Sequence, residues 1–176
     1  ILKKKILSFN KKISIPGDKS ISIRWVLISS LANGISKARN LLLSHDVLAA
    51  IKTIKKLGIK VSLKNQNCKI YGAGMNGYQY KKGIILDAEN SGTLSRLIAG
   101  LLVNSPYPIK IVGDKSLSRR DFKRIANPLK KFGANLKLKQ NYTLPLTIKG
   151  ADKLKPIKFS ENKGSAQVKS SIIFAG

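Results

Sequence analysis

The apolar positions of this chain recur with a helical period in some segments and alternate with polar positions in shorter segments between them. The helical spacing predicts five helices, at 19–33, 44–57, 92–103, 119–132 and from Ser165 towards Gly176. The alternation predicts short strands at 36–40, 59–63, 68–71, 83–86, 109–112, 134–138 and 144–148. This mixture of helices and strands indicates an α/β (α+β) fold.

The order of these elements repeats along the chain. Ser20, Ser91 and Ser165 each stand at the start of an apolar helix, 71 and 74 residues apart, and the segments 54–61 and 129–136 lie 75 residues apart. Two markers in register indicate a structural repeat. We therefore expect a pseudo-threefold arrangement of βαβαββ units, with repeat 1 at 18–77, repeat 2 at 78–150 and the start of repeat 3 at 151–176. The glycine-rich segment 72–77 is the expected linker.

The first helix of each repeat differs from the second in its side chains. The helices at 19–33 and 92–103 are apolar nearly all round, which favours a central position, whereas those at 44–57 and 119–132 carry lysines along one side. If the repeats pack around a pseudo-symmetric axis, the N-termini of the central helices meet at one end.

Each of these first helices begins with a polar segment and has a basic residue about one turn in, at 18–24, 90–96 and 164–169. A helix N-terminus offers unpaired N–H groups and the positive end of the helix dipole, and a nearby cation adds a full charge. We interpret the three starts as anion-binding sites. A turn with a helix cap explains each segment equally well when that segment is considered alone.

The net charge of +26 invites a nucleic-acid-binding interpretation. The excess comes from 28 lysines and 6 arginines, aromatic residues make up only 6%, and the lysines are scattered along the whole chain. Base recognition and stacking rely on arginine and on aromatic side chains among the basic ones. We therefore expect no nucleic-acid partner, and a basic RNA-binding module stays as an alternative.

The chain contains one cysteine, Cys68, and one histidine, His45. A single cysteine excludes an intramolecular disulfide, and so few soft ligands disfavour a zinc or iron–sulfur site. We expect neither a metal nor a cofactor. No long apolar run or secretory signal is present, which predicts a cytoplasmic protein that makes no contact with a membrane.

Four motifs, in order and with their spacing, carry a resemblance to a known family. They are Pro-Gly-Asp-Lys-Ser-Ile-Ser-Ile-Arg at 16–24, Asn-Ser-Gly-Thr with Arg-Leu at 90–97, Gly-Asp-Lys-Ser-Leu-Ser-Arg-Arg at 113–120 and Ser-Ala-Gln-Val-Lys-Ser at 165–170. Together they resemble the N-terminal part of the 5-enolpyruvylshikimate-3-phosphate synthases, also called 3-phosphoshikimate 1-carboxyvinyltransferases. The resemblance spans nearly all of this chain but under half of a full-length member.

The resemblance implies transfer of the enolpyruvyl group of phosphoenolpyruvate to the 5-hydroxyl of shikimate 3-phosphate, with release of phosphate, in the shikimate pathway to chorismate and the aromatic amino acids. Both substrates are anions. Bringing them together costs on the order of several kcal/mol unless cations and N–H groups are already in place, so a cationic cleft is required. We expect the full-length protein to be a monomer.

The resemblance also assigns roles to nine residues. Those implied for shikimate 3-phosphate are Lys19, Ser20, Arg24, Ser165, Ala166 and Gln167. Those implied for phosphoenolpyruvate are Lys19, Asn90, Gly92, Arg120 and Gln167. At Gly92 the missing Cβ would let the ligand approach the backbone. Arg120, not Arg119, matches the arginine that clamps phosphoenolpyruvate.

The chain departs from the family pattern at a few positions. Ile23 stands where His is common and Trp25 where Ala is frequent, and we expect both to repack the core. Asp121 and Phe122 replace the usual Pro-Met after Arg120, which leaves the direction of that arginine open.

The resemblance further implies a second domain, which would supply the catalytic carboxylates from beyond Gly176. The strand near 6–15 would belong to that domain, so residues 1–17 go with it and residues 18–176 with the first domain. We therefore expect this chain alone to be inactive, and its catalytic base is unassigned.

The nearest alternative is the sister family that transfers enolpyruvyl to UDP-N-acetylglucosamine with the same repeat architecture. That family usually has Lys-Asn where this chain has Lys19-Ser20, and a loop cysteine as acid, whereas Cys68 lies in a predicted strand. The motifs therefore favour shikimate 3-phosphate as the acceptor.

Overall fold

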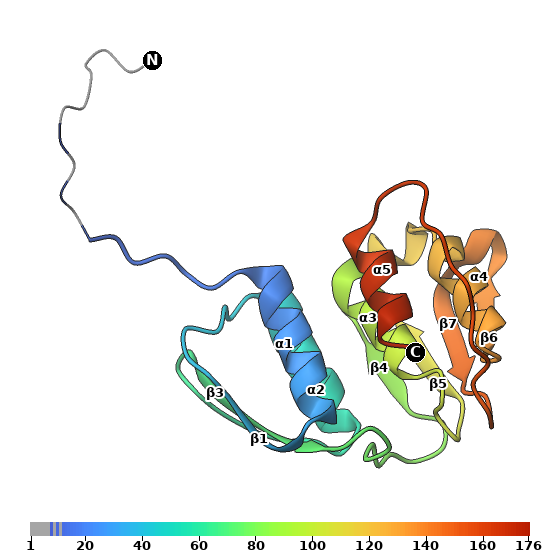
Figure 1. The fold of residues 1–176 in the computed structure, drawn as a ribbon, viewed down its shortest axis with the longest axis horizontal. Coiled ribbons are helices and arrows are strands. Elements are labelled where there is room, and N and C mark those ends of the chain that lie inside the picture. The colour runs from blue at the N-terminus through green and yellow to red at the C-terminus, as the bar shows by residue number, and fades with distance from the viewer. Residues whose placement is uncertain (1–7, 9, 11) are drawn as a thin grey trace.

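The computed structural model describes residues 8, 10 and 12–176, which form two α/β units followed by a further helix (Figure 1). Its helices are α1 (Lys19–Leu31), α2 (His45–Lys56), α3 (Gly92–Leu101), α4 (Lys123–Lys131) and α5 (Ala166–Ile173), with 3-10 turns η1 (Leu117–Arg119) and η2 (Gln140–Tyr142). Its strands are β1 (Asn33–Ala38), β2 (Lys60–Lys64), β3 (Asn67–Ala73), β4 (Ile85–Asp87), β5 (Ile109–Val112), β6 (Asn135–Lys139) and β7 (Thr143–Lys149). The expected fold class is confirmed.

The two sheets share one plan. The first has the order β1-β3-β2, with both pairs antiparallel, and Ser36 and Val61 lie on either side of Ile70. The second has the order β4-β5-β7-β6, in which β5, β7 and β6 repeat that antiparallel arrangement and β4 adds parallel to β5. Within the described residues, the first sheet therefore lacks only a counterpart of β4. The strand expected near 6–15 falls partly outside the described residues, and residues 12–15 pair with no strand.

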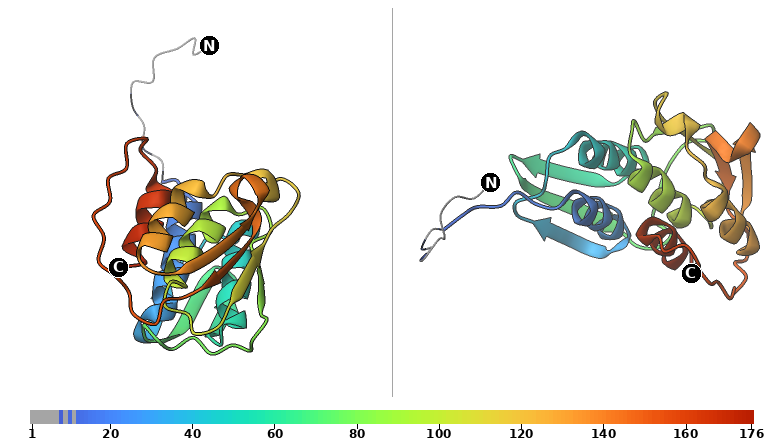
Figure 2. Two further views of the ribbon diagram at one scale, coloured as in Figure 1. Left: turned by 90° about the vertical axis from the view of Figure 1, so that its right-hand side faces the viewer. Right: turned by 90° about the horizontal axis from the view of Figure 1, so that it is seen from above.

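Helices α1, α2 and α3 lie between the two sheets, as Figure 2 shows from above. Helix α3 is central, since it contacts α1, α2 and α5, and every residue of it except Arg96 is buried. The prediction of all-round burial is wrong for α1, where Ile21 is 68% exposed and Ile28 is 52% exposed. One face of α1 is thus left uncovered in this chain.

Several predicted boundaries are wrong for local reasons. Residues 119–132 do not form one helix, because Arg120 is extended and the Asp121 carboxylate accepts a hydrogen bond from the Lys123 amide at 2.6 Å. This side-chain bond starts α4 only at Lys123. Asn33 and Gly34 open β1 instead of closing α1, and residues 72–73 of the predicted linker belong to β3.

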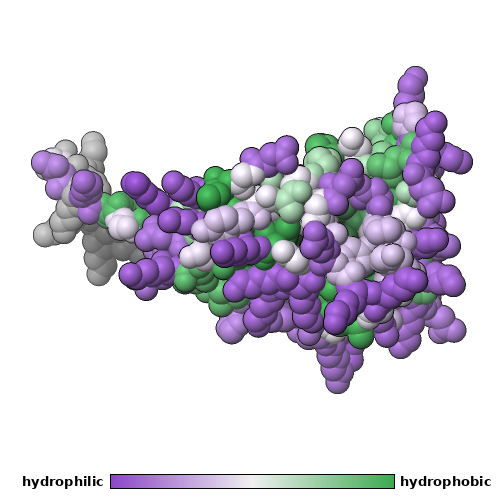
Figure 3. All heavy atoms as spheres, turned by 90° about the horizontal axis from the view of Figure 1, so that it is seen from below, coloured by the Kyte–Doolittle hydropathy of each residue, from purple (hydrophilic) through white to green (hydrophobic). Residues whose placement is uncertain are grey.

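On the face drawn in Figure 3, hydrophilic side chains cover most of the protein and apolar groups show between them. This spread agrees with lysines scattered along the sequence. Within the described part of the chain, no helix combines the length and apolar character needed to cross a membrane.

Candidate anion-binding site at three helix starts

The starts of α1, α3 and α5 have the same capping geometry. In each, the side chain of the residue before the helix accepts a hydrogen bond from the backbone amide three residues later. The pairs are Asp18 with Ile21 at 2.7 Å, Ser91 with Leu94 at 3.2 Å and Ser165 with Val168 at 3.3 Å. Each cap satisfies one N–H group and leaves others of the first turn open to a ligand.

Arg24 joins the start of α1 to α5. Its Nε and Nη2 donate to the Ser170 hydroxyl at 3.2 and 3.1 Å, and Nη2 also lies 3.5 Å from the Ala166 carbonyl. Its Nη1 donates to the Ser20 carbonyl at 3.1 Å. The guanidinium is therefore fixed between the two helices.

Gln167 joins the start of α5 to α3. Its Oε1 accepts a hydrogen bond from Arg96 Nη1 at 2.7 Å, and its Nε2 donates to Thr93 Oγ1 at 2.9 Å. Arg24 and Gln167 together bring the three predicted helix starts into one place.

Arg96 is held on several sides. Its guanidinium lies 5.2 Å from the centre of the Phe122 ring, and its Nη2 donates to the Asp121 carbonyl at 3.3 Å. Burial, and then the charges of Arg120 and Arg124, lower the pKa of Arg96, because each disfavours a cation there. A bound anion would relieve this electrostatic cost.

Gly92 lies directly beside two guanidinium groups. A Cβ at this position would be 2.8 Å from Arg120 Nη1 and 3.0 Å from Arg96 Nη1. The missing side chain therefore keeps open a space that faces two cations and the start of α3.

The side chain of Arg120 is held by a neutral amide, which is itself bonded to a carboxylate. Its Nη2 donates to Asn90 Oδ1 at 2.9 Å, and Asn90 Nδ2 donates to Asp114 Oδ2 at 2.6 Å. The other Asp114 oxygen accepts from the Leu117 amide at 2.7 Å. Because an amide separates Arg120 from the carboxylate, the arginine is positioned without being neutralised. The bond with Asn90 thus sets the direction of the Arg120 side chain, which the replacement of Pro-Met by Asp121 and Phe122 had left open.

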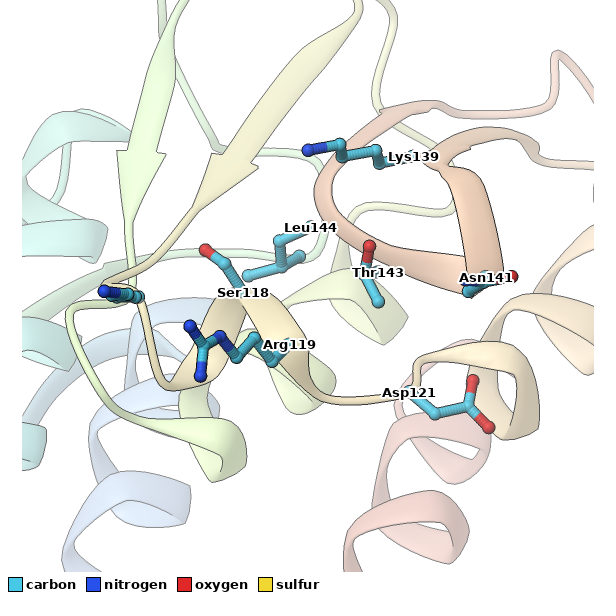
Figure 4. Close-up of a pocket in the computed structure, with 8 residues that line it drawn as sticks. Ser118, Arg119, Asp121, Lys139, Asn141, Thr143 and Leu144 are labelled. Carbon is cyan, nitrogen blue, oxygen red and sulfur yellow. The ribbon is translucent and has the colours of Figure 1, made fainter.

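Arg119 and Arg120 lie in different surroundings. Arg119 lines an open pocket of about 480 Å³ with Lys115, Asp121 and Lys139, which Figure 4 shows next to η1. Arg120 lies beside Gly92. Of the two adjacent arginines, Arg120 is therefore the one beside the start of α3.

Lys19 stands at the first turn of α1, with its Nζ 3.4 Å from Asp46 Oδ2 and its side chain 51% exposed. The pair is accessible to solvent, so its attraction is weak and an anion can compete for the lysine. Lys19 and Ser20 thus lie at the α1 edge of the site, and Asn90, Gly92 and Arg120 lie on the α3 side.

Sequence reasoning missed three contributors, Thr93, Arg96 and Ser170. Thr93 and Arg96 belong to the motif at 90–97, but their contacts with Gln167 depend on how α3 packs against α5. Ser170 ends the motif at 165–170, but its bonds with Arg24 depend on how α1 and α5 come together. Within the described residues, no cluster of three or more His, Cys, Asp or Glu side chains has a geometry for a metal ion.

The family model for EPSP synthase (3-phosphoshikimate 1-carboxyvinyltransferase) matches residues 3–176. The chain belongs to the EPSP synthase family. The 3-phosphoshikimate 1-carboxyvinyltransferase of Desulforamulus reducens is 43% identical over 93% of this chain and 38% of its own length, and that of Bacillus cereus strain G9842 is 42% identical over 95% of this chain and 39% of its own.

The solved structure of the EPSP synthase from Acinetobacter baumannii matches with a TM-score of 0.89 and 36% identity, over 94% of this chain and 38% of that one. The family inferred from the four motifs is therefore confirmed. This EPSP synthase-family chain spans about 38% of the length of the relatives that it matches.

Proposed function

We propose that this chain is the anion-binding part of an enolpyruvyl transferase that acts on phosphoenolpyruvate and shikimate 3-phosphate. The observation that carries the proposal is the placement of Arg96 and Arg120 beside Gly92 at the start of α3. Within the described residues, neither guanidinium forms an ion pair with a carboxylate. A small ligand with a phosphate and a carboxylate would supply compensating charge through charge-assisted hydrogen bonds. The names of the relatives support the same reaction.

In this proposal, shikimate 3-phosphate lies between α1 and α5. Lys19 and Ser20 contribute from α1, and Arg24 keeps one Nη1 proton beyond those donated to Ser20, Ala166 and Ser170. Ser165, Ala166 and Gln167 form the capped start of α5, whose free N–H groups suit a phosphate.

Phosphoenolpyruvate then lies above Gly92, between Lys19, Asn90, Arg120 and Gln167. In the addition step the methylene carbon gains a proton, and the 5-hydroxyl oxygen loses its proton as it bonds to C2. In the elimination step phosphate leaves C2 and the new methyl group loses a proton, which restores the carbon–carbon double bond. The cations and N–H groups hold the two anions next to each other and oppose their repulsion.

Proton transfer at carbon needs an acid–base group within reach. Asp18, Asp46 and Asp114, the carboxylates tied to this site, are already engaged by the Ile21 amide, Lys19 and Asn90. We propose that the catalytic carboxylate comes from another part of the full-length protein, so that this chain binds the substrates without converting them. The same proposal keeps residues 18–176 as one incomplete domain, assigns 1–17 to a second domain, and describes a cytoplasmic monomer without a cofactor.

Calorimetric binding of shikimate 3-phosphate to the chain tests the proposal. Lys19→Ala should weaken binding about tenfold or more, because a charge-assisted bond is lost, whereas Lys130→Ala on the exposed side of α4 should leave it unchanged. Equal affinity of wild type and Lys19→Ala, or tighter binding of UDP-N-acetylglucosamine, contradicts the proposal. Phosphate release from the two substrates by the chain alone contradicts its binding-only part.

A further inference from the structure

The orientation of the Gln167 amide follows from the chemistry of its neighbours. The Arg96 guanidinium carries only donors, so the Gln167 atom 2.7 Å from it must be the oxygen. The amide nitrogen therefore faces Thr93 Oγ1, 2.9 Å away, and donates to it. The three side chains form a chain of hydrogen bonds with one direction, from Arg96 to Gln167 to Thr93.

This direction leaves the Thr93 hydroxyl with a proton to donate. Its oxygen accepts from Gln167, and within the described residues the hydroxyl donates to no protein acceptor. Thr93 is only 6% exposed, so the proton has little access to bulk water. A buried donor without an acceptor costs free energy that a ligand oxygen would recover.

The position of Thr93 places that donor next to the proposed ligand. Thr93 follows Gly92 in the first turn of α3, and its partner Gln167 bonds the same Arg96 Nη1 that faces the space at Gly92. Arg96 cannot easily release Gln167, because the Phe122 ring and the Asp121 carbonyl hold its guanidinium from other sides. The direction of the hydrogen bonds is therefore set by a rigid group.

We propose that Thr93 is a further binding residue for phosphoenolpyruvate, with its hydroxyl donating to an anionic oxygen of the ligand. Arg96 is the positioning residue, which acts on Thr93 through Gln167. This inference rests on the proposed function, because it needs an oxyanion above Gly92. It gives Arg96 a positioning role in addition to the charge that it places beside Gly92.

Titrations of the chain with phosphoenolpyruvate, in the presence of shikimate 3-phosphate, test the role of Thr93. Thr93→Val keeps the shape and removes the hydroxyl, and should weaken phosphoenolpyruvate binding about tenfold, as expected for a hydrogen bond to a charged group. Thr93→Ser restores the hydroxyl and should bind within about twofold of wild type. Lys130→Gln, on the exposed side of α4, removes a charge outside the site and serves as the control.

The affinity for shikimate 3-phosphate separates binding from folding. A variant that only disturbs the fold weakens both ligands, whereas loss of the Thr93 donor affects phosphoenolpyruvate alone. Arg96→Lys tests the positioning role: its effect on phosphoenolpyruvate affinity should shrink markedly in the Thr93→Val background, since both changes interrupt one chain of bonds.

The outcomes are distinct. If the wild-type chain binds both ligands and Thr93→Val binds phosphoenolpyruvate equally well, the role of Thr93 is overturned and the proposed function stands. If the effects of Arg96→Lys and Thr93→Val are additive, the positioning role of Arg96 is overturned. If the wild-type chain binds neither ligand, the proposed function fails and this inference fails with it.

Discussion

The guanidinium of Arg24 on α1 and the hydroxyl of Ser170 on α5 are hydrogen-bonded across 146 positions of sequence, at 3.2 and 3.1 Å. The contact joins the first and the third helix start directly. Because Arg24 also binds the Ser20 and Ala166 carbonyls, one side chain fixes the distance between two proposed phosphate-binding segments.

Loss of the Ser170 hydroxyl should therefore loosen α5. Ser170→Ala removes the acceptor of two bonds from a charged group, and we expect the free energy of unfolding to fall by about 1–3 kcal/mol in urea denaturation. Ser160→Ala, at an exposed serine that bonds only Asn162, is the matched control. Equal stability of the two variants would show that Arg24 does not secure α5.

Two glycines of α3 should respond differently to the same added methyl group. At Gly92 the methyl would come within 2.8 Å of Nη1 of Arg120, an exposed side chain that can move. Gly92→Ala should therefore displace Arg120 and weaken phosphoenolpyruvate binding about tenfold or more while the protein stays folded. At Gly100 a Cβ would lie 2.1 Å from the Ser171 backbone oxygen, which cannot move without shifting α5.

Gly100→Ala should therefore lower the free energy of unfolding by about 3 kcal/mol. Thermal unfolding and ligand titration of both variants give the comparison. The steric explanation is wrong if Gly92→Ala is the less stable of the two, or if it binds phosphoenolpyruvate as wild type does.

Tyr78 should make stability fall in strongly alkaline solution. Burial raises the pKa of its hydroxyl to about 12, although the hydrogen bond with Ser30 at 2.7 Å acts in the opposite direction. The folded state thus holds the proton more tightly than the unfolded state between about pH 10 and 12, so the free energy of unfolding decreases as pH rises through this range, by about 2 kcal/mol.

The difference in unfolding free energy between wild type and Tyr78→Phe isolates this contribution from the deprotonation of the lysines. That difference should shrink from pH 9 to pH 11.5. A constant difference would mean that Tyr78 ionises as readily in the folded state as in the unfolded chain.

Ionisation of Glu161 should make the stability of the protein depend on pH in acidic solution as well. Its hydrogen bond from Arg124 lowers the pKa of its carboxyl below the usual 4.5. The stabilisation is fully present above that usual value and is lost as pH falls through the lower value in the folded state. The melting temperatures of wild type and Glu161→Gln should differ most at pH 7 and approach each other below about pH 4. A gap that widens on acidification would refute this role.

Much of the fold could be predicted because the pattern of apolar residues in most segments matches the way in which those segments pack in the structure. The strand at 109–112 has the predicted bounds, and the hairpin around residues 65–66 forms between strands that alternate as expected. The helix at 119–132 was mispredicted because the apolar period continues through the segment, while the Asp121 side chain interrupts the backbone. The predicted burial of α1 was too high, because an apolar composition does not show how many sides of a helix are covered by its neighbours.

The residues of the candidate site could likewise be predicted only in part. Short motifs in a fixed order along the chain predicted Lys19, Gly92, Arg120 and Gln167 as site residues. Arg96 and Ser170 could not be assigned, because each acts through a partner from a helix about 70 residues or more away in sequence. Such pairings follow from packing between repeats, which no local pattern encodes.

The three caps have the same geometry but not the same charge. Asp18 places a full negative charge at the start of α1, whereas Ser91 and Ser165 are neutral. The electrostatic potential along this edge therefore varies: an approaching anion is attracted to the open dipoles of α3 and α5, whereas at α1 its attraction depends on the exposed side chain of Lys19. The same capped helix start thus gives two anion-binding points with fixed backbone donors, at α3 and α5, and one at α1 that depends on a movable side chain.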